Sequence, residues 1–235
     1  MVSAFILATL GLPLNSVAED RVERAYRLAR PRLQELCEKG NIAYPPKRLY
    51  FRAFKQERIL EIWASGSPRK PMQRLEEFPI AGMSGNLGPK RKEGDLQVPE
   101  GLYYIDRFNP QSRFRLSLGI NYPNASDRIR SDKSKPGGDI FIHGDTKSIG
   151  CLAMTDEVID QIYVLALEAK AAGQSQIPVH IFPFKLTERS LAPRQTSPWI
   201  EFWKELEPAY RQFERTRYVP SFKVGADGSY KFEKA

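Results

Sequence analysis

The sequence contains few of the residues that catalysis and metal binding most often use. Among 235 residues there are two cysteines, Cys37 and Cys151, and two histidines, His143 and His180. Structural zinc usually takes four ligands at short regular spacings, and these four residues show no such spacing. We therefore predict no metal and no other cofactor. In an oxidising compartment the two cysteines could form a disulfide, which would leave no free thiol, so a disulfide-stapled structural protein and a cysteine enzyme are opposed predictions.

A long apolar segment is also missing. The stretch from Phe5 to Leu14 is too short for an ordinary membrane span. No charged side chain precedes it, but Ser16 and Ala18 have the spacing that a signal peptidase requires. We predict that residues 1–18 are a signal peptide, that the protein is periplasmic, and that it contacts the membrane only through an uncleaved signal.

Long runs of like charge are absent, although basic residues outnumber acidic ones by 36 to 28, which gives a net charge of +8. A positive balance favours an anionic partner such as nucleic acid, an acidic membrane surface or a wall polymer. The basic residues are scattered along the chain, and no basic–aromatic motif of nucleic-acid-binding domains occurs. We predict no nucleic-acid partner.

The first half of the chain predicts a helix followed by short strands. Apolar residues recur three or four apart from Glu19 to Lys39, which indicates an amphipathic helix that Gly40 ends and Pro31 kinks or splits. Short segments rich in aromatic and branched residues follow, separated by turn residues: 48–54, 58–64, 77–81, 102–107, 113–120 and 139–143. Such a series is typical of a sandwich or a barrel-like sheet.

The second half adds loops, helices and one more strand. Segments 82–101 and 121–138 predict two long loops of the kind that often serve function. Thr155 is expected to cap a helix that ends at Gly173. A strand at 177–182 and an amphipathic segment from Trp199 to Arg217, broken at Pro208, follow. We predict an N-terminal helical arm at 19–46, a main catalytic domain at 47–190 and a C-terminal helical extension and tail at 191–235.

The stretch from Ile140 to Met154, IFIHGDTKSIGCLAM, carries the candidate chemistry. A strand delivers His143, and a glycine-containing turn delivers Cys151 shortly before a predicted helix. A thiolate is a strong nucleophile, and its pKa falls beside an imidazole and near the positive end of a helix. Backbone amides around Gly150 and Cys151 could stabilise a developing oxyanion.

A purely structural role for Cys151 and His143 stays open at this point. A small buried cysteine and a satisfied core histidine are both common in proteins. Asp139 and Asp145 flank His143, and either carboxylate could orient the imidazole. His180 alternates with apolar residues along a predicted strand, so we expect a structural role for it.

The order of residues around the cysteine resembles the signature of a known family. His143-Gly144 followed by Ser148-Ile149-Gly150-Cys151 is similar to the YkuD-type L,D-transpeptidase catalytic domain, in which a His-Gly pair precedes a Ser-His-Gly-Cys turn. Further similarity to the YafK-like branch of this family extends roughly from Leu49 to Arg217. It includes FKQER at 54–58, GPK at 88–90, GD at 94–95, PEG at 99–101, NYPN at 121–124, PF at 183–184 and FW at 202–203.

This resemblance implies a mainly β fold with flanking helices, built on an L,D-transpeptidase-like β-sandwich that needs no metal. It implies that Cys151 is the nucleophile and His143 the general base, while Ser148, Gly150 and the Cys151 amide shape the turn and the oxyanion site. The implied substrate is a peptidoglycan stem peptide, attacked at the L-centre carbonyl of diaminopimelate. The acyl group then passes to an amine or to water, and the YafK-like branch implies hydrolysis that releases peptidoglycan-linked lipoprotein.

Three departures from the family pattern stand out. This chain has Ile149 where the turn usually has histidine, Ala153 where arginine or asparagine is common, and a shorter gap after His143. Ile149 removes a polar group from the substrate side, and Ala153 removes one that could hold a substrate carboxylate. A non-catalytic peptidoglycan-binding module is therefore the alternative interpretation.

Three residues in the long loops are candidates for substrate binding. Lys90 lies in a short basic run that could contact acidic wall peptides, although such runs are often only hydrated. Tyr122 and Asn124 could line a peptide groove, and turn formation explains them equally well.

Overall fold

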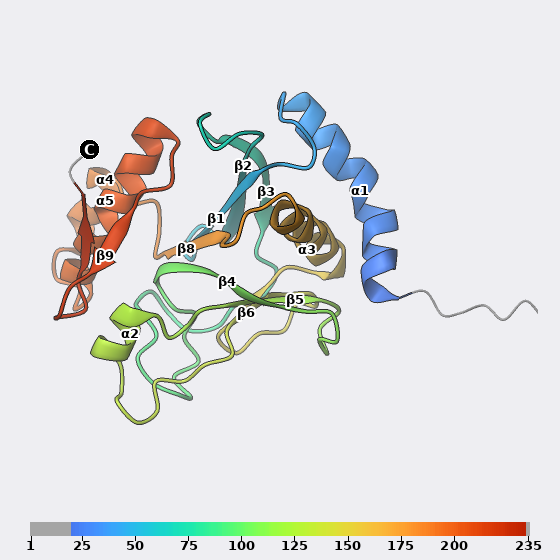
Figure 1. The fold of residues 1–235 in the computed structure, drawn as a ribbon. Helices are drawn as coiled ribbons and strands as arrows, with labels where there is room; N and C mark the ends of the chain where they lie inside the picture. Colours follow the sequence, from blue (N-terminus) through green and yellow to red (C-terminus); the bar gives the residue numbers. More distant parts are fainter. Residues whose placement is uncertain (1–19, 234–235) are drawn as a thin grey trace, which may run out of the picture.

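The computed structural model describes residues 20–233, so the predicted signal peptide lies outside the described part of the chain. The fold is mainly β with flanking helices, as the sequence predicts (Figure 1). The strands are β1 (Arg48–Phe54), β2 (Ile59–Ser65), β3 (Gln73–Pro79), β4 (Gly101–Asn109), β5 (Ser117–Ile120), β6 (Phe141–His143), β7 (Leu152–Ala153), β8 (Pro178–Phe182), β9 (Phe222–Val224) and β10 (Tyr230–Phe232). The helices are α1 (Arg21–Lys39), α2 (Ala125–Arg130), α3 (Asp156–Ala171), α4 (Glu188–Leu191), the 3-10 turn η1 (Ala192–Arg194) and α5 (Ile200–Thr216).

One curled, eight-stranded sheet forms the framework, in the order β3-β2-β1-β8-β4-β5-β6-β7. A register shift between Ile105 and Arg107 lets β4 pair with β8 through its first residues and with β5 through its last. Gly82, shortly after β3, forms an antiparallel bridge with Ala153 in β7. The segment that follows one edge strand therefore reaches the other edge strand and ties the curled sheet together.

Helix α3 lies between two parts of this sheet, with β1 to β3 on one side and β5 and β6 on the other (Figure 1). Its first turn is capped as the sequence predicts, because the Thr155 hydroxyl accepts the Val158 N–H at 3.4 Å. Ile159, Ile162 and Leu165 are buried in the main core. Each fully buried side chain of this size stabilises the fold by roughly 1.5–3 kcal/mol.

Helix α1 packs against α3 on the outside of the molecule (Figure 1). Ala25, Ala29, Leu33 and Cys37 form its buried face. Pro31 lies within the helix and does not split it, so that part of the prediction is wrong. The arm therefore belongs to the main hydrophobic core.

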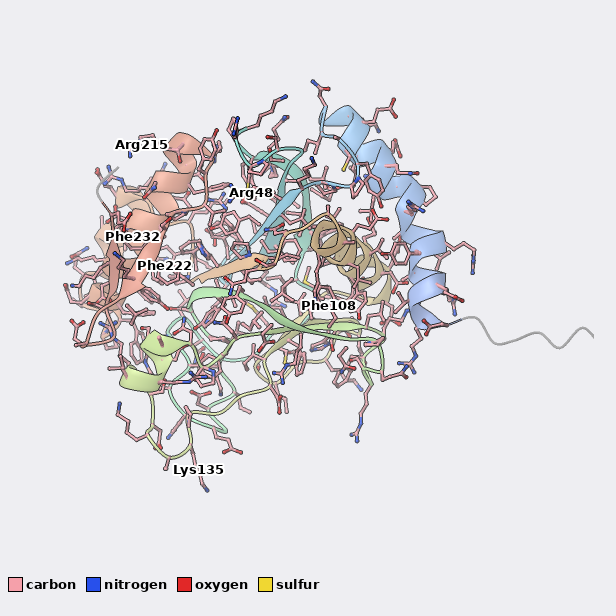
Figure 2. All side chains as sticks on the ribbon, viewed as in Figure 1. Arg48, Phe108, Lys135, Arg215, Phe222 and Phe232 are labelled. Atoms are coloured by element: carbon pink, nitrogen blue, oxygen red, sulfur yellow. The ribbon has the colours of Figure 1, made fainter. Side chains whose placement is uncertain are left out.

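The C-terminal segment covers another face of the sheet with a second apolar cluster. Helix α5 is continuous through Pro208, so the predicted break is wrong. Strands β9 and β10 form a hairpin, and its Phe222 and Phe232 side chains lie together with ring centroids 6.3 Å apart (Figure 2).

Two further expectations are corrected. The predicted loop at 121–138 contains α2, which begins after Asn124. Cys37 and Cys151 are both free thiols, so the structure contradicts the disulfide-stapled alternative. In residues 20–233 no helix combines the length and the apolar character that a membrane crossing requires.

Candidate active site

His143 and Cys151 come together because the short parallel strands β6 and β7 carry them side by side. His143 is paired with Ala153 in this register, and residues two apart in a strand point to the same face. Cys151, two residues before Ala153, therefore lies on the His143 face. The Phe141 N–H donates to the Cys151 Sγ at 3.4 Å, and the thiol lies 3.7 Å from the Asp139 carbonyl oxygen.

Ser148 and Gly150 shape the turn that ends at Cys151. The Ser148 Oγ accepts the Cys151 N–H at 2.8 Å and donates to the Cys151 carbonyl oxygen at 2.7 Å. Gly150 has a φ of +108°, which side-chain-bearing residues rarely adopt, and a Cβ there would lie 3.3 Å from the Gln97 carbonyl oxygen. Because Ser148 engages the Cys151 amide, this predicted oxyanion donor is occupied in the present conformation.

The Gly144 carbonyl oxygen orients the imidazole of His143, at 2.5 Å from Nδ1. A carbonyl oxygen only accepts, so Nδ1 carries the proton and Nε2 is the basic nitrogen. Within residues 20–233, neither Asp139 nor Asp145 forms a hydrogen bond with the ring. Burial lowers the pKa of His143, and the Gly144 bond and the Asp145 charge oppose this effect.

The thiol of Cys151 is neutral in the resting site. Burial raises the pKa of Cys151, the Phe141 N–H opposes that rise, the Asp139 charge adds to it, and the Lys90 charge opposes it. The sequence-based expectation of a lowered thiol pKa is therefore wrong for this state. Strand β7 and the capping residue Thr155 separate the sulfur from the start of α3, which leaves burial as the main influence.

One cavity of 260 Å³ is lined by both His143 and Cys151, the predicted base and nucleophile. The ring of Phe114 covers His143, with ring centroids 4.7 Å apart at an interplanar angle of 32°. Ser117, opposite His143 in the β5–β6 pair, lines the same cavity. The remaining lining residues are Asn109, Ser112, Arg113, Asp139 and Phe141. The site can therefore receive a small acyl group between the aromatic ring of Phe114 and the polar side chain of Ser117.

The other sequence-predicted binding residues lie outside the set that lines this cavity. Lys90 is buried, and its Nζ donates to the Asp95 carboxylate at 2.6 Å. The Tyr122 hydroxyl donates to the Pro136 carbonyl oxygen at 2.9 Å. Asn124 caps α2 and donates to the Leu102 carbonyl oxygen at 3.0 Å. We infer that all three hold the loops in place, and that Lys90 also acts on Cys151 through its charge.

The second histidine and the possible metal ligands also bear on where the chemistry takes place. His180 is buried, with Nδ1 2.6 Å from the Tyr50 hydroxyl, in line with the structural role expected for it. Among residues 20–233, no group of three or more histidine, cysteine, aspartate or glutamate side chains could hold a metal.

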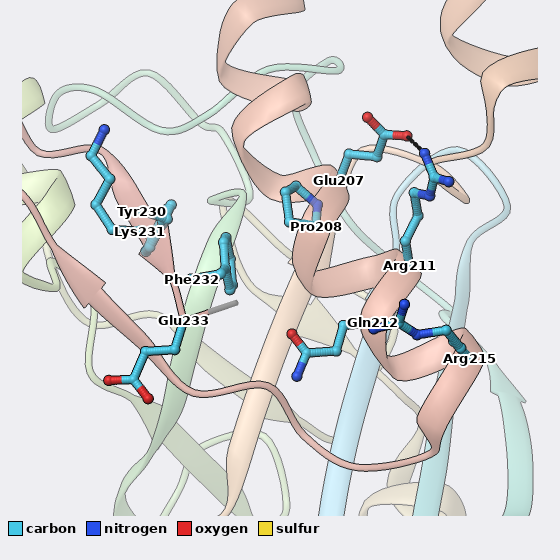
Figure 3. Close-up of a pocket in the computed structure, with 9 residues that line it drawn as sticks. All are labelled: Glu207, Pro208, Arg211, Gln212, Arg215, Tyr230, Lys231, Phe232 and Glu233. Carbon is cyan, nitrogen blue, oxygen red and sulfur yellow. Dashed lines mark hydrogen bonds and ion pairs between the residues drawn. The ribbon is translucent and has the colours of Figure 1, made fainter. Parts of the chain in front are cut away.

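A wider hollow of 730 Å³ lies between α5 and β10 (Figure 3). Arg211 and Arg215 line it together with Phe232, and Arg211 is paired with Glu207 at 3.3 Å. Neither a cysteine nor a histidine belongs to the residues that form this hollow. The predicted nucleophile and the predicted base are both at the β6–β7 site.

Sequence reasoning missed the part of the site that the β4–β5 connection supplies. Phe114 and Arg113 fall within the predicted strand 113–120, but only residues 117–120 form β5. The residues before them form a loop that lies beside His143. No local pattern marks this contact, because it depends on the pairing of β5 with β6.

Comparison with known proteins identifies the family. Residues 50–181 match the YkuD family, described as the L,D-transpeptidase catalytic domain. The chain is 37% identical over 188 residues to the protein named "Putative L,D-transpeptidase YafK" of Escherichia coli. The aligned region covers 79% of this chain and 74% of that protein.

Two solved structures show lower similarity. A mutant of the helical cell shape determining protein Pgp2 from Campylobacter jejuni aligns with a TM-score of 0.45 and 18% identity, over 81% of this chain and 65% of that one. Bd1075 of Bdellovibrio bacteriovorus aligns with a TM-score of 0.43 and 21% identity, over 73% of this chain and 59% of that one. This chain thus spans less than two thirds of both solved chains. The family match and the YafK match each cover more than half of the chain, and on that basis it belongs to the YkuD family of L,D-transpeptidase catalytic domains.

Proposed function

We propose that this protein is a peptidoglycan enzyme that forms a thioester between Cys151 and the acyl part of a stem peptide. The observation that carries the proposal is that Cys151 and His143 lie on one face of the β6–β7 pair and line one cavity. Family membership supports the substrate class, a stem peptide cleaved at the L-centre carbonyl of diaminopimelate. An enzyme of this family must reach peptidoglycan, so we place the protein in the periplasm.

Acylation starts from a neutral thiol and a neutral imidazole. As the Cys151 sulfur attacks the carbonyl carbon, the His143 Nε2 takes the thiol proton. The bond between that carbon and the departing amine nitrogen then breaks, and the imidazolium returns the proton to the amine. Because burial disfavours the charged forms of both side chains, the separated charges arise only as the attack proceeds.

Deacylation decides the product. If an amine attacks the thioester, the carbon–sulfur bond breaks, the thiol is restored, and a new amide links two wall components. If water attacks, the same bond breaks and a free carboxylate is released. Similarity to the YafK-like branch supports peptidoglycan-linked lipoprotein as one substrate of the hydrolytic route.

The turn around Cys151 supports this chemistry by fixing the sulfur. Ser148 holds both the amide and the carbonyl of Cys151, and Gly150 provides the backbone conformation that the turn requires. Binding of an oxyanion at the Cys151 amide then requires the Ser148 Oγ to move away by rotation about χ1. This is a change of side-chain rotamer, so the exchange leaves the backbone in place.

Intact-mass spectrometry after incubation with sacculi tests the thioester directly. The wild type and a Cys37→Ala variant should both gain an acyl adduct, and Cys151→Ala should gain none. Cys37 is the matched control because it is buried against α3, and burial raises its pKa to about 11. If the wild type binds sacculi, remains folded and forms no adduct, the protein is a non-catalytic peptidoglycan-binding module.

A second experiment separates transfer from hydrolysis. Sacculi that carry bound lipoprotein are incubated with the enzyme, and free lipoprotein is measured together with new cross-links. Release of lipoprotein indicates water as the acceptor, and new cross-links from tetrapeptide stems indicate an amine. Cys151→Ala should abolish either product.

A further inference from the structure

The loop 112–115, which precedes β5, forms one wall of the Cys151 cavity and is held from two sides. Arg21 of α1 donates to the Ser112 carbonyl oxygen at 2.7 Å and to the Arg115 carbonyl oxygen at 3.2 Å. The Arg115 guanidinium donates to both carboxylate oxygens of Asp160 in α3, at 2.9 and 2.8 Å. The backbone of this loop is therefore fixed by the two helices that pack outside the sheet.

Three of the four side chains in the loop make contacts within the protein. The Ser112 Oγ accepts the Phe114 N–H at 3.1 Å, the Phe114 ring covers His143, and Arg115 is paired with Asp160. Arg113 differs from them. It is exposed, it lines the cavity of Cys151, and within residues 20–233 its guanidinium forms no hydrogen bond or ion pair.

The other charged side chain that lines the cavity, apart from His143, is already paired. Asp139 is the second charged residue of the lining, and Arg107 lies 3.2 Å from its carboxylate. The Arg107 guanidinium also lies over the Phe141 ring, 4.9 Å from the centroid. Arg113 therefore supplies an unpaired positive charge beside the nucleophile, on a backbone that cannot easily move away.

We propose that Arg113 binds a carboxylate of the peptide substrate and so sets the enzyme's preference for acidic peptides. This inference rests on the proposed function, which brings a stem peptide to Cys151. Two carboxylates of such a peptide lie near the attacked carbonyl: the D-centre carboxylate of diaminopimelate and the C-terminal carboxylate of the residue that follows. A guanidinium donates two parallel hydrogen bonds to a carboxylate, which gives orientation as well as affinity.

Equilibrium binding to a catalytically blocked protein tests this role without any turnover. Calorimetry compares Cys151→Ala with Cys151→Ala/Arg113→Ala, each titrated with a synthetic diaminopimelate tetrapeptide and with versions amidated at one carboxylate at a time. We expect Arg113→Ala to weaken binding of the fully acidic peptide about tenfold, which is the effect of losing about 1.4 kcal/mol. Arg113→Lys should keep the charge and lose the paired geometry, so its affinity should lie between the two.

The amidated peptides identify the carboxylate. Amidation of the carboxylate that Arg113 binds should weaken binding to the Cys151→Ala protein and have no further effect in the double variant. Amidation elsewhere should act equally on both proteins. Cys151→Ala/Arg189→Ala is the matched control, because Arg189 is exposed on α4 and its loss changes the net charge by the same amount.

Several results would overturn the inference. Equal affinity of the two proteins for the acidic peptide would do so, as would an Arg113→Ala effect that is the same for every amidated peptide, or an equal loss in the Arg189 control. A parent protein that binds none of the peptides would also overturn it. Failure of the proposed function would appear separately, as a wild-type protein that binds the peptide but gains no adduct in the mass experiment.

Discussion

Lys55, directly after β1, is a buried cation whose removal tests how the 82–100 segment is held against the sheet. Its Nζ donates to the carbonyl oxygens of Gly88 at 2.8 Å and Val98 at 2.9 Å, and lies 3.0 Å from the Glu100 carboxylate. The side chains of Lys55 and Glu100 are 2% and 0% exposed. Burial lowers the pKa of Lys55 and the Glu100 charge opposes that fall, so the cost of burying the ammonium exceeds the attraction of its partner.

Lys55→Met should destabilise the protein strongly, because it leaves the Glu100 charge buried without its partner. Removing one member of a buried ion pair costs about 3–5 kcal/mol. In a chain of this length that loss lowers Tm by roughly 6–20 °C. Urea and thermal unfolding measure both quantities. The control is Lys204→Met, which removes a surface pair with Glu201 and should change stability by less than about 0.5 kcal/mol.

A double-mutant cycle shows whether the unpaired charge is the cause. Gly88 and Trp203 donate their N–H groups to different oxygens of the Glu100 carboxylate, at 2.7 and 2.8 Å. Glu100→Gln removes the charge and keeps an acceptor for one of these two groups, which costs less than an unpaired buried charge. Lys55→Met/Glu100→Gln should therefore be more stable than Lys55→Met by at least about 1 kcal/mol. A loss below about 1 kcal/mol for Lys55→Met, or no relief in the double variant, would refute the view that this pair anchors the segment.

Three further predictions concern the site and its supports. Because burial raises the pKa of Cys151, labelling of the unliganded protein by iodoacetamide should be slow at neutral pH and accelerate through alkaline pH; a plateau already reached below pH 7 would contradict this. Burial lowers the pKa of His180 from 6.5 to about 3. Between these two pH values the imidazole is protonated in the unfolded chain and neutral in the folded protein, so the free energy of unfolding should fall by about 1.4 kcal/mol for each unit of decreasing pH. Urea titrations at several pH values should show a shallower slope for His180→Gln, and an unchanged slope would count against this group. Arg21→Ala should lower the acylation rate about tenfold by freeing the loop that covers His143 and carries Arg113, with the pH midpoint little changed. Arg21→Lys should recover part of the rate in stopped-flow assays, and equal rates would show that α1 does not position the loop.

Much of the framework could be predicted because its signals are local. Strand β1 has the predicted bounds, and α3 begins after the predicted cap, since residue type and hydrophobic spacing determine both. Pro31 and Pro208 mislead because a proline inside a helix removes a backbone hydrogen bond and its ring clashes with the preceding turn, a combined cost of about 3 kcal/mol that local reasoning treats as decisive. Apolar side chains on both sides of each proline are buried, and this packing offsets the loss.

Only part of the candidate site could be predicted from the sequence. His143 and Cys151 follow from the family pattern, and strand register explains how they meet. Phe114 and Arg113 could not be placed, because the pairing of distant strands brings their loop to the site. Strand β7 has two residues and is defined by its partners, so no sequence window could reveal it.

Ile149 and Ala153, the two residues of the Cys151 turn that depart from the family pattern, lie in very different environments. Ile149 is 80% exposed, so it changes the rim that an approaching group passes. Ala153 is fully buried and exchanges backbone hydrogen bonds of 2.9 and 3.1 Å with Gly82, whose own Cβ would lie 1.8 Å from the Thr146 carbonyl oxygen. A long polar side chain at position 153 would have to displace that segment, and the free positive charge of the cavity comes from Arg113 instead. We infer that the altered turn leaves the predicted pair of Cys151 and His143 in place and changes the exposed rim beside it.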